Sequence, residues 1–324
     1  MSPSTHTGKA ESVLIHHTLM YASPEELVAK ALPFFEEGLD SRNTVMTITC
    51  PANLVALRAA LGRRSGNVRF KRSREWYAKP AEVIGRYTTY LREQLAQGSP
   101  SAYIVAEVPW PQNDERLDRE WVRYEAIINR IFAASPVRFV CLYDTKRHDP
   151  SIIEAALTSH RTEITEDGVR SSSMYVPPER MIRRITPPLA TPAGRGRRFG
   201  PEDPVPAAAY VADLAREAGL DGSTARDAAV ATIEILGPSM LHRTPVTVTA
   251  WTEGDRFVWQ IERRGGEGIA PWSGYGPPSS DDRDGWGPWL ARHLTDTMEI
   301  GRGGAGPAVQ LTVGRGRPRQ TLTR

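Results

Sequence analysis

The fold of the first half of the chain is decided by residues 13–50, VLIHHTLMYASPEELVAKALPFFEEGLDSRNTVMTITC. Residues 13–21 and 44–50 have the short, apolar, β-favouring composition of strands. Residues 23–39 begin with Ser-Pro-Glu-Glu, which is typical of a helix start with an N-cap, an early proline and acidic residues in the first turn. This order predicts a β-α-β unit with two parallel strands.

The same alternation continues to about residue 160. Three further strand patterns cover 67–70, 102–108 and 137–143, and four further helical patterns cover about 52–61, 79–97, 119–133 and 150–159. Alternating strands and helices favour a mainly parallel sheet with helices on both faces. We therefore expect an α/β domain of the Rossmann or RecA-like class.

Composition narrows the class of protein. A chain of 324 residues with 40% hydrophobic content is long enough for two packed domains. No stretch approaches the roughly 20 apolar residues needed to span a bilayer, and the N-terminus lacks the features of a secretory signal, so a cytoplasmic protein without membrane contact is expected. Cys50 and Cys141 are too few for a disulfide framework and are interpreted as small buried side chains.

Charge gives little indication of a nucleic-acid partner. The net charge is +3, and the excess of Arg lies mainly in residues 180–200 and in the tail. The sequence has no aromatic-interleaved basic stripe, helix-turn-helix or zinc-finger pattern, so specific nucleic-acid recognition is not expected.

The chain divides by composition into four parts. They are a domain at 12–165, a Pro- and Arg-rich linker at 166–204, a second domain at 205–315 and a basic tail at 316–324. Within the second domain, two helical patterns at 204–236 precede two alternating strands at 245–263, a short helix within 286–298 and a strand at 307–313. This predicts an α+β domain.

Polar residues of the first domain fall where a parallel sheet binds ligands, beyond the carboxyl ends of its strands. Glu107 follows the fourth strand, and Tyr143 and Asp144 end the fifth. Glu125 and Asn129 lie one turn apart on a helical stripe that is otherwise apolar.

His17 and Trp110 complete the set. His17 alternates with Ile15 and Leu19 and so shares a strand face with them. Each residue also has a purely structural interpretation. His17 would be a core histidine with its hydrogen bonds satisfied, Glu125 would pair with Arg123, and Trp110 would pack in the core. Together they predict a small-ligand pocket with few polar groups among aromatic side chains.

Four motifs carry a family resemblance: the stretch from His16 to Gly62, AEVPW at 106–110, WVRYEAIIN at 121–129 and CLYDT at 141–145. Residues 12–165 resemble the MEDS sensory domain, known from methanogen and methylotroph regulators and common in actinobacteria. The resemblance implies an α/β input domain for small hydrocarbon-like compounds, without established catalysis. Family-typical positions are held by His17, Glu107, Trp110, Glu125, Asn129, Cys141, Tyr143 and Asp144.

The second domain resembles the histidine-kinase-like (GHKL, Bergerat) ATPase module of anti-sigma-factor serine kinases of the actinobacterial type. In that family a helix carries a Glu, followed four residues later by an Asn that coordinates magnesium. In IEILGPSML, residues 233–241, Glu234 keeps the acid but Pro238 stands at the Asn position. Gly237-Pro238 is also expected to kink or end the helix after Leu236.

The adenine-binding acid is missing as well. In IERRGGEG, residues 261–268, Arg263 or Arg264 stands where the family has Asp, and an Arg accepts no hydrogen bond. Gly285 and Gly287 retain the GxG that opens a helix under the phosphates. We interpret Glu234, Gly285 and Gly287 as a vestigial nucleotide site. A shifted alignment, with Glu262 as the adenine acid and Ser239 replacing the Asn, stays open.

These inferences predict a regulator in which the first domain senses a small, apolar ligand. A kinase-like, non-catalytic second domain then signals to a sigma factor or an anti-sigma-antagonist protein. A homodimer is compatible with the sequence. No metal or cofactor is expected, and ATP with magnesium only if the second site is functional.

Two alternatives remain. One is an active serine/threonine kinase with an atypical ATP site. The other is a first domain that is an enzyme or a metal or haem site using His17, Glu107 and Cys141, although no nucleophile elbow, Walker loop or HExxH motif supports it.

Overall fold

The computed structural model describes residues 14–110, 114–189, 194–237, 244–278, 282 and 285–314. The chain forms two compact units. Within the described ranges, the first unit holds residues 14–78, 86–110 and 125–178, and the second holds 79–85, 114–124 and 179–314.

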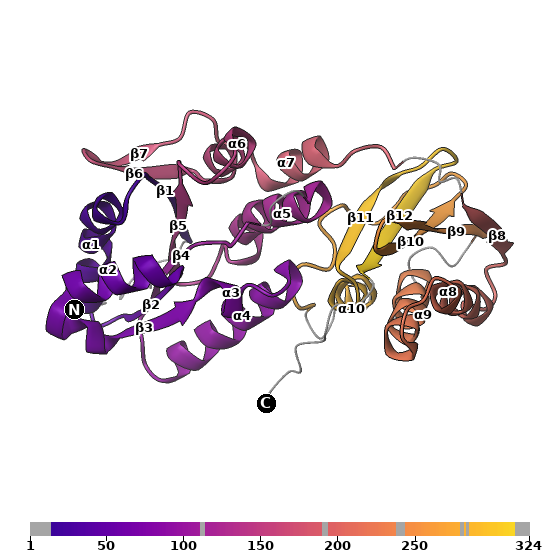
Figure 1. Cartoon of the computed structure of the whole chain (residues 1–324), viewed down its shortest axis with the longest axis horizontal. Helices are drawn as coiled ribbons and strands as arrows, with labels where there is room; N and C mark the ends of the chain where they lie inside the picture. Colours follow the sequence, from indigo (N-terminus) through magenta and orange to yellow (C-terminus); the bar gives the residue numbers. More distant parts are fainter. Residues whose placement is uncertain are drawn as a thin grey trace, which may run out of the picture. The chain divides into compact units, whose positions relative to one another are not determined.

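The described part of the first unit contains a seven-stranded sheet in the order β3-β2-β4-β5-β1-β6-β7 (Figure 1). All neighbouring strands are parallel except the antiparallel pair β6–β7. The strands are β1 Ile15–Tyr21, β2 Thr44–Thr49, β3 Val68–Arg72, β4 Ala102–Ala106, β5 Val137–Asp144, β6 Thr162–Thr165 and β7 Gly168–Ser171. The prediction of a mainly parallel α/β unit is confirmed.

The helices alternate with these strands as the sequence patterns predict. They are α1 Pro24–Asp40, α2 Pro51–Leu61, α3 Ser73–Trp76, α4 Pro80–Ala96, α5 Glu115–Ile131 and α6 Pro150–Ser159, with a 3-10 turn at Gly62–Asn67. The predicted start of α1 is confirmed, because the Ser23 hydroxyl accepts a hydrogen bond from the Glu26 amide.

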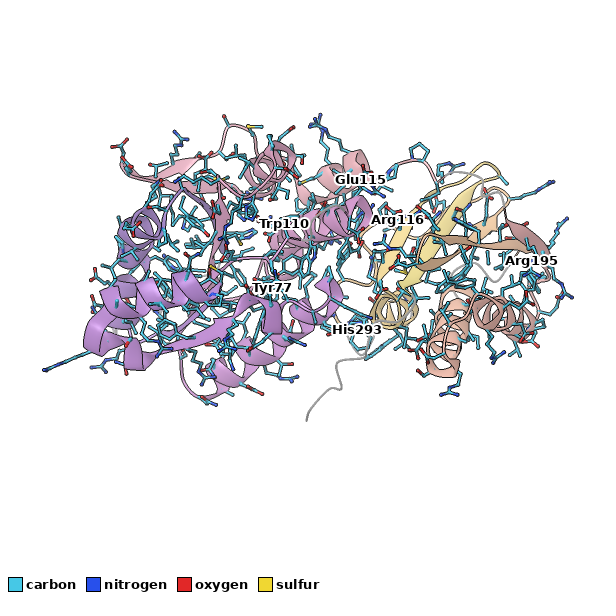
Figure 2. The ribbon with its side chains drawn as sticks, viewed as in Figure 1. Tyr77, Trp110, Glu115, Arg116, Arg195 and His293 are labelled. Atoms are coloured by element: carbon cyan, nitrogen blue, oxygen red, sulfur yellow. The ribbon has the colours of Figure 1, made fainter. Side chains whose placement is uncertain are left out.

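The two faces of this sheet have different cores. Helices α1 and α2 cover one face, where Leu19, Phe35 and Val105 belong to one apolar cluster. On the other face the Phe139 ring meets Tyr87 of α4 at 5.1 Å and Phe132, beyond α5, at 5.8 Å between centroids. Side chains fill the space between the sheet and its helices (Figure 2). Strand β1 is therefore covered on both sides.

Helix α5 contributes to both units. Its residues 115–124 belong to the second unit and residues 125–131 to the first. In the second unit the buried Arg123 guanidinium lies 3.1 Å from Glu120 and 3.2 Å from Glu299. Arg292 donates to the other oxygen of Glu120 at 2.6 Å. Each buried charge of this network thus has a partner of opposite sign, as its burial requires.

The described part of the second unit contains a five-stranded antiparallel sheet in the order β11-β12-β10-β9-β8. Its strands are β8 Arg195–Phe199, β9 Val246–Glu253, β10 Arg256–Arg263, β11 Thr297–Arg302 and β12 Pro307–Gly314. The helices are α7 Pro178–Ile185, α8 Val205–Glu217, α9 Gly222–Leu236 and α10 Trp286–Leu294. The predicted β9–β10 hairpin is confirmed, and α8 and α9 pack on one face of the sheet (Figure 1).

The segment 166–204 differs from the expected linker, because it contains β7, α7 and β8. The Pro and Arg content of this segment suggested a linker, but its helix α7 is amphipathic and buries Met181 and Ile182. Strand β8 pairs with β9 at the edge of the sheet, where its exposed arginines suit an edge strand.

Helix α9 ends at Leu236 with Gly237 as its C-cap, which confirms the predicted effect of the Gly-Pro pair. Pro238 itself lies outside the described residues. In the part of the chain that the structure describes, no helix combines the length and apolarity that crossing a membrane requires.

The Arg123 network predicts a strong effect of one substitution. Arg123→Ala should lower the free energy of unfolding by about 3 kcal/mol, because it removes a buried cation from beside two carboxylates. Arg216→Ala breaks an exposed ion pair with Asp213 and should change the free energy of unfolding by less than about 0.5 kcal/mol. Urea denaturation measures both; equal effects would contradict the importance of the buried network.

Candidate functional site

Strands β1 and β5 place three polar side chains on the sheet face that α4 and α5 cover. In their parallel register His16 pairs with Phe139, Thr18 with Cys141 and Met20 with Tyr143. Because paired residues of neighbouring parallel strands face the same side, His16, Cys141 and Tyr143 point toward the helices.

Two helices supply the remaining members of this group. Helix α5 contributes Glu125 and Asn129, one turn apart, and His160 is the residue at which α6 ends. We call His16, Glu125, Asn129, Cys141, Tyr143 and His160 the Glu125 cluster. Its four strongest metal-binding side chains, on His16, Glu125, Cys141 and His160, belong to residues between 0 and 6% exposed, which excludes bulk water from them.

The hydrogen bonds of His160 determine its tautomer. Its Nδ1 lies 2.8 Å from the backbone oxygen of Ala156, which only accepts hydrogen bonds, so Nδ1 carries the proton. The Nε2 atom therefore presents a lone pair. It lies 3.6 Å from Glu125 Oε2 and has no hydrogen-bond partner among the described residues.

His16 has the same tautomer for a related reason. The Asn129 amide nitrogen donates to the Ser159 backbone oxygen at 2.8 Å, which turns Asn129 Oδ1 toward His16 Nδ1 at 3.2 Å. His16 Nδ1 is consequently the donor. Its Nε2 lone pair faces Cys141 Sγ at 3.2 Å and Glu125 Oε2 at 3.7 Å.

The two imidazoles thus direct lone pairs at one carboxylate and one thiol. The donor atoms of His16, Glu125, Cys141 and His160 all lie within 4.8 Å of one another. These four residues could hold a metal ion, and both histidines already make the outer hydrogen bond that orients a metal-bound imidazole.

Burial also controls the charges. It raises the pKa of Glu125 to about 8, an effect that hydrogen bonds from Cys141 and Tyr143 reduce. Burial raises the pKa of the Cys141 thiol well above its ordinary value. It lowers the pKa of His160 to about 4 and that of His16 well below its ordinary value. Without a bound cation, these four groups are therefore predominantly uncharged at pH 7.

Unpartnered polar atoms surround the cluster. The buried atoms Thr18 Oγ1, Trp110 Nε1, His148 Nδ1 and His160 Nε2 have no hydrogen-bond partner among the described residues. The rings of Trp110, His148 and His160 all contact the Tyr143 ring. The centroid distances from Tyr143 are 6.4 Å to Trp110, 5.9 Å to His148 and 5.8 Å to His160. Each such atom costs about 1–3 kcal/mol if it stays unsatisfied, so this neighbourhood is suited to a ligand.

Glu107 belongs to a different network. Its carboxylate accepts hydrogen bonds from the Tyr21 hydroxyl at 2.8 Å, from the Cys50 amide at 3.0 Å and from the Thr49 hydroxyl. Asn53 donates to the same Tyr21 oxygen at 2.9 Å. The protein's own donors therefore satisfy Glu107, and the predicted gathering of polar residues divides into two groups.

The other predicted residues are spread around these groups. His17 lies on the sheet face opposite His16 and contacts the Thr162 hydroxyl at 2.7 Å. Asp144 accepts from the Lys146 amide at 2.9 Å in the turn after β5. Trp110, labelled in Figure 2, lies beside Tyr143 at the edge of the Glu125 cluster.

His16 and His160 were not singled out from the sequence. The His16-His17 dipeptide contained the necessary signal, because one of two adjacent strand histidines must face each side of the sheet. His160 follows a predicted helix end and has no sequence pattern that would distinguish it.

In the second unit, packing accounts for part of the suspected nucleotide site. Gly285 is the N-cap of α10, and a side chain at Gly287 would collide with the backbone oxygen of Glu234 in α9. The Glu262 carboxylate accepts from the amides of Ala305 at 2.6 Å and Gly306 at 3.3 Å, so it is already engaged. Ser239 lies outside the described residues.

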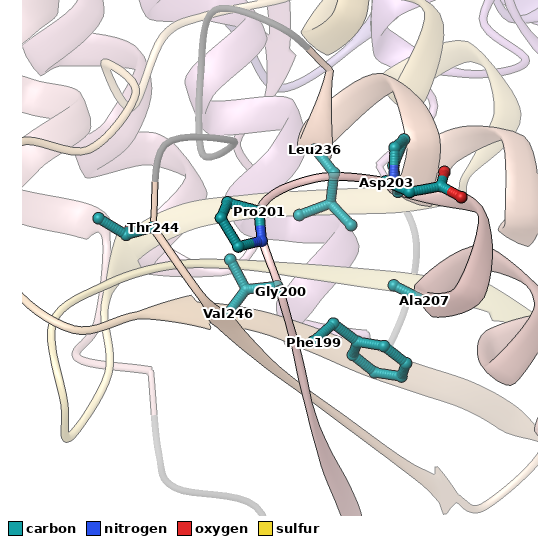
Figure 3. A pocket seen from close by; sticks show the side chains of 9 residues that line it. Phe199, Gly200, Pro201, Asp203, Ala207, Leu236, Thr244 and Val246 are labelled. Atoms are coloured by element: carbon teal, nitrogen blue, oxygen red, sulfur yellow. The ribbon is translucent and has the colours of Figure 1, made fainter.

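A small pocket of this unit does not include those residues (Figure 3). Its lining is mainly apolar and consists of Phe199, Gly200, Pro201, Asp203, Pro204, Ala207, Leu236, Thr244 and Val246. Asp203 uses a carboxylate oxygen to accept from the Val205 amide at 2.9 Å, at the start of α8.

The packing of Gly287 predicts a stability effect. Gly287→Ala should lower the free energy of unfolding by about 2 kcal/mol, because the new methyl group meets the α9 backbone. Gly222→Ala lies in the first turn of α9, where the new methyl group would only touch the Arg226 side chain at 4.0 Å, and it should leave the free energy of unfolding unchanged or raise it slightly. Denaturant titration of both variants tests this, and a harmless Gly287→Ala would leave the glycine without a packing explanation.

The raised pKa of Glu125 predicts a pH dependence for the metal-free protein. A carboxyl whose pKa rises from 4.5 to about 8 on folding contributes stability below pH 4.5 that is lost as the pH rises through 8. The free energy of unfolding should fall by up to about 1.4 kcal/mol per unit between pH 6.5 and 7.5.

Urea denaturation in a chelating buffer measures this slope. Glu125→Gln should remove the carboxyl's share of it, because the amide does not titrate. Glu36→Gln, at an exposed position on α1, should keep the wild-type slope. Equal slopes in wild type and Glu125→Gln would contradict the assignment.

The comparisons with known proteins concern the first unit. Residues 15–161 match the model of the MEDS family, described as MEthanogen/methylotroph, DcmR Sensory domain. No curated protein matches the chain. The match covers every member of the Glu125 cluster, and it confirms over this range the resemblance drawn from the sequence motifs.

Proposed function

We propose that the chain is a signal-transduction regulator that senses a small, apolar ligand through its MEDS domain. The observation that carries the proposal is the set of buried, unpartnered polar atoms around Tyr143, in a domain of a sensory family. A ligand-binding site typically combines an apolar, aromatic lining with a few convergent polar groups.

The lining indicates the chemistry of the ligand. Trp110 and His148 both contact the Tyr143 ring, and the Trp110–His148 centroid distance is 6.4 Å. A small hydrocarbon-like molecule suits these rings, and one polar group on it would satisfy Trp110 Nε1 or His148 Nδ1.

Helix α5 is the element through which the signal would pass. Glu125 and Asn129 belong to the cluster in the first unit, whereas Glu120 and Arg123 are held in the buried ion network of the second. A ligand that prefers one position of Glu125 shifts the population of helix positions. The same helix carries that shift to the Arg123 network.

The output, we propose, is a kinase-like, non-catalytic second domain that binds a sigma factor or an anti-sigma-antagonist protein. The support is the sequence resemblance together with the absence of the magnesium-binding Asn and the adenine-binding Asp. The engagement of Glu262 with backbone amides adds to it, because that carboxylate is not free for adenine.

Native mass spectrometry of protein taken from its own cells tests ligand binding. The wild type should carry an additional small-molecule mass, and Trp110→Leu should carry at most about a tenth of it, because the ring that borders the site is lost. Trp286→Leu, at an exposed position on α10, should retain the mass. Equal retention in both variants would remove Trp110 from the ligand site.

Isothermal titration with ATP and magnesium tests the output domain. No binding is expected in the micromolar range. Magnesium-dependent micromolar binding would support the alternative of an active kinase, which phosphate transfer to a candidate antagonist, lost in Glu234→Ala, would then establish.

A further inference from the structure

We infer that His16, Glu125, Cys141 and His160 bind one zinc ion at the centre of the first unit. The metal site stands on the geometry of these residues, whereas any role for the ion in signalling rests on the function proposed above. The site ties together β1, β5, α5 and the end of α6.

Three of the six separations between donor atoms are close to those of a tetrahedral centre. Zinc bonds of about 2.0–2.3 Å place the donors of a tetrahedron about 3.3–3.8 Å apart. The separations from His16 Nε2 to Cys141 Sγ and Glu125 Oε2 are 3.2 and 3.7 Å, and His160 Nε2 lies 3.6 Å from Glu125 Oε2. All six lie within 4.8 Å, so side-chain shifts of about 1 Å would bring the four donors around one ion.

The donor types also favour zinc. Two imidazole nitrogens, one thiolate and one carboxylate form a mixed, borderline-soft set that suits this ion and does not suit calcium or magnesium. Binding displaces one proton from the Cys141 thiol and one from the Glu125 carboxyl. The resulting two negative charges balance the dication, so the buried centre is electrically neutral.

The histidines are already oriented for the metal. His160 Nδ1 donates to the Ala156 backbone oxygen and His16 Nδ1 to Asn129, so both Nε2 lone pairs face the centre. His160 Nε2 has no hydrogen-bond partner among the described residues, and the nearest cluster oxygen, Glu125 Oε2, lies 3.6 Å away. A cation supplies the missing partner.

Metal analysis of purified wild-type protein is the first test. One zinc ion per chain should remain after dialysis, and a chelated sample should take up one equivalent again. The His160→Gln variant should retain roughly a tenth or less of the zinc that the wild type binds. His17→Gln, which changes the neighbouring histidine on the other sheet face, should keep the full equivalent. A wild type that neither contains nor takes up zinc overturns the inference.

Cobalt substitution tests the ligands without requiring that every variant fold. Wild-type protein reconstituted with Co(II) should show the ligand-field bands of a tetrahedral ion and a thiolate-to-cobalt charge-transfer band. Cys141→Ser should lose the latter band and Cys50→Ser, the matched cysteine control, should keep it. Asn129→Ala should weaken metal affinity by about 10–100-fold through the loss of imidazole orientation. A charge-transfer band that survives Cys141→Ser overturns the assignment.

Hydrogen exchange separates this inference from the proposed function. Removing zinc should accelerate amide exchange along residues 115–131, because Glu125 loses its metal bond. Zinc binding without that change supports the metal centre and overturns its part in signalling. A retained small molecule in a protein that binds no zinc supports the proposed function and overturns the metal centre.

Discussion

Helix α5 places polar side chains in two separate buried networks along its length. The rest of the structure depends on keeping the partners of both networks in place. Its first half holds Arg123 between the carboxylates of Glu120 and Glu299, so the burial of that cation depends on the second unit. Two residues later Glu125 enters the Glu125 cluster of the first unit. Buried charges tolerate little displacement from their partners, because an unpaired ion costs several kcal/mol. A change at Glu125 therefore has to be absorbed within a few residues or transmitted along the helix.

Two groups that are not metal ligands in the proposed site determine which imidazole nitrogens of the Glu125 cluster carry lone pairs. The Ala156 carbonyl and the Asn129 amide each place a proton on an imidazole Nδ1, which leaves both Nε2 atoms as lone pairs. Burial then disfavours charge on every member, as the raised pKa of Glu125 and the lowered pKa of His160 indicate. The cluster is consequently rich in lone pairs and lacks positive charge. This combination suits a cation that displaces the protons of Glu125 and Cys141, whereas the adjacent rings of Trp110 and Tyr143 are better suited to an apolar ligand.

The sequence predicted the parallel sheet and its helices well, because hydrophobic periodicity depends on local residues. It selected His17, which lies on the face opposite the Glu125 cluster, because β1 is covered on both faces and alternation there does not mark an outer side. It offered Arg123 as a structural partner for Glu125, but Arg123 pairs with Glu120 and with Glu299, which is distant in sequence. His160 could not be found either, because its role depends on contacts with His16 and Glu125, which come from other elements of the fold. Short-range patterns therefore gave the framework, and long-range pairing gave the site.

Packing explains a glycine of the second unit that the sequence interpretation assigned to a nucleotide site. Gly287 is required by the close approach of α10 to the backbone of α9, so the glycine stays useful whether or not a phosphate binds above it. The GxG spacing of Gly285 and Gly287 is therefore no evidence of nucleotide binding by itself.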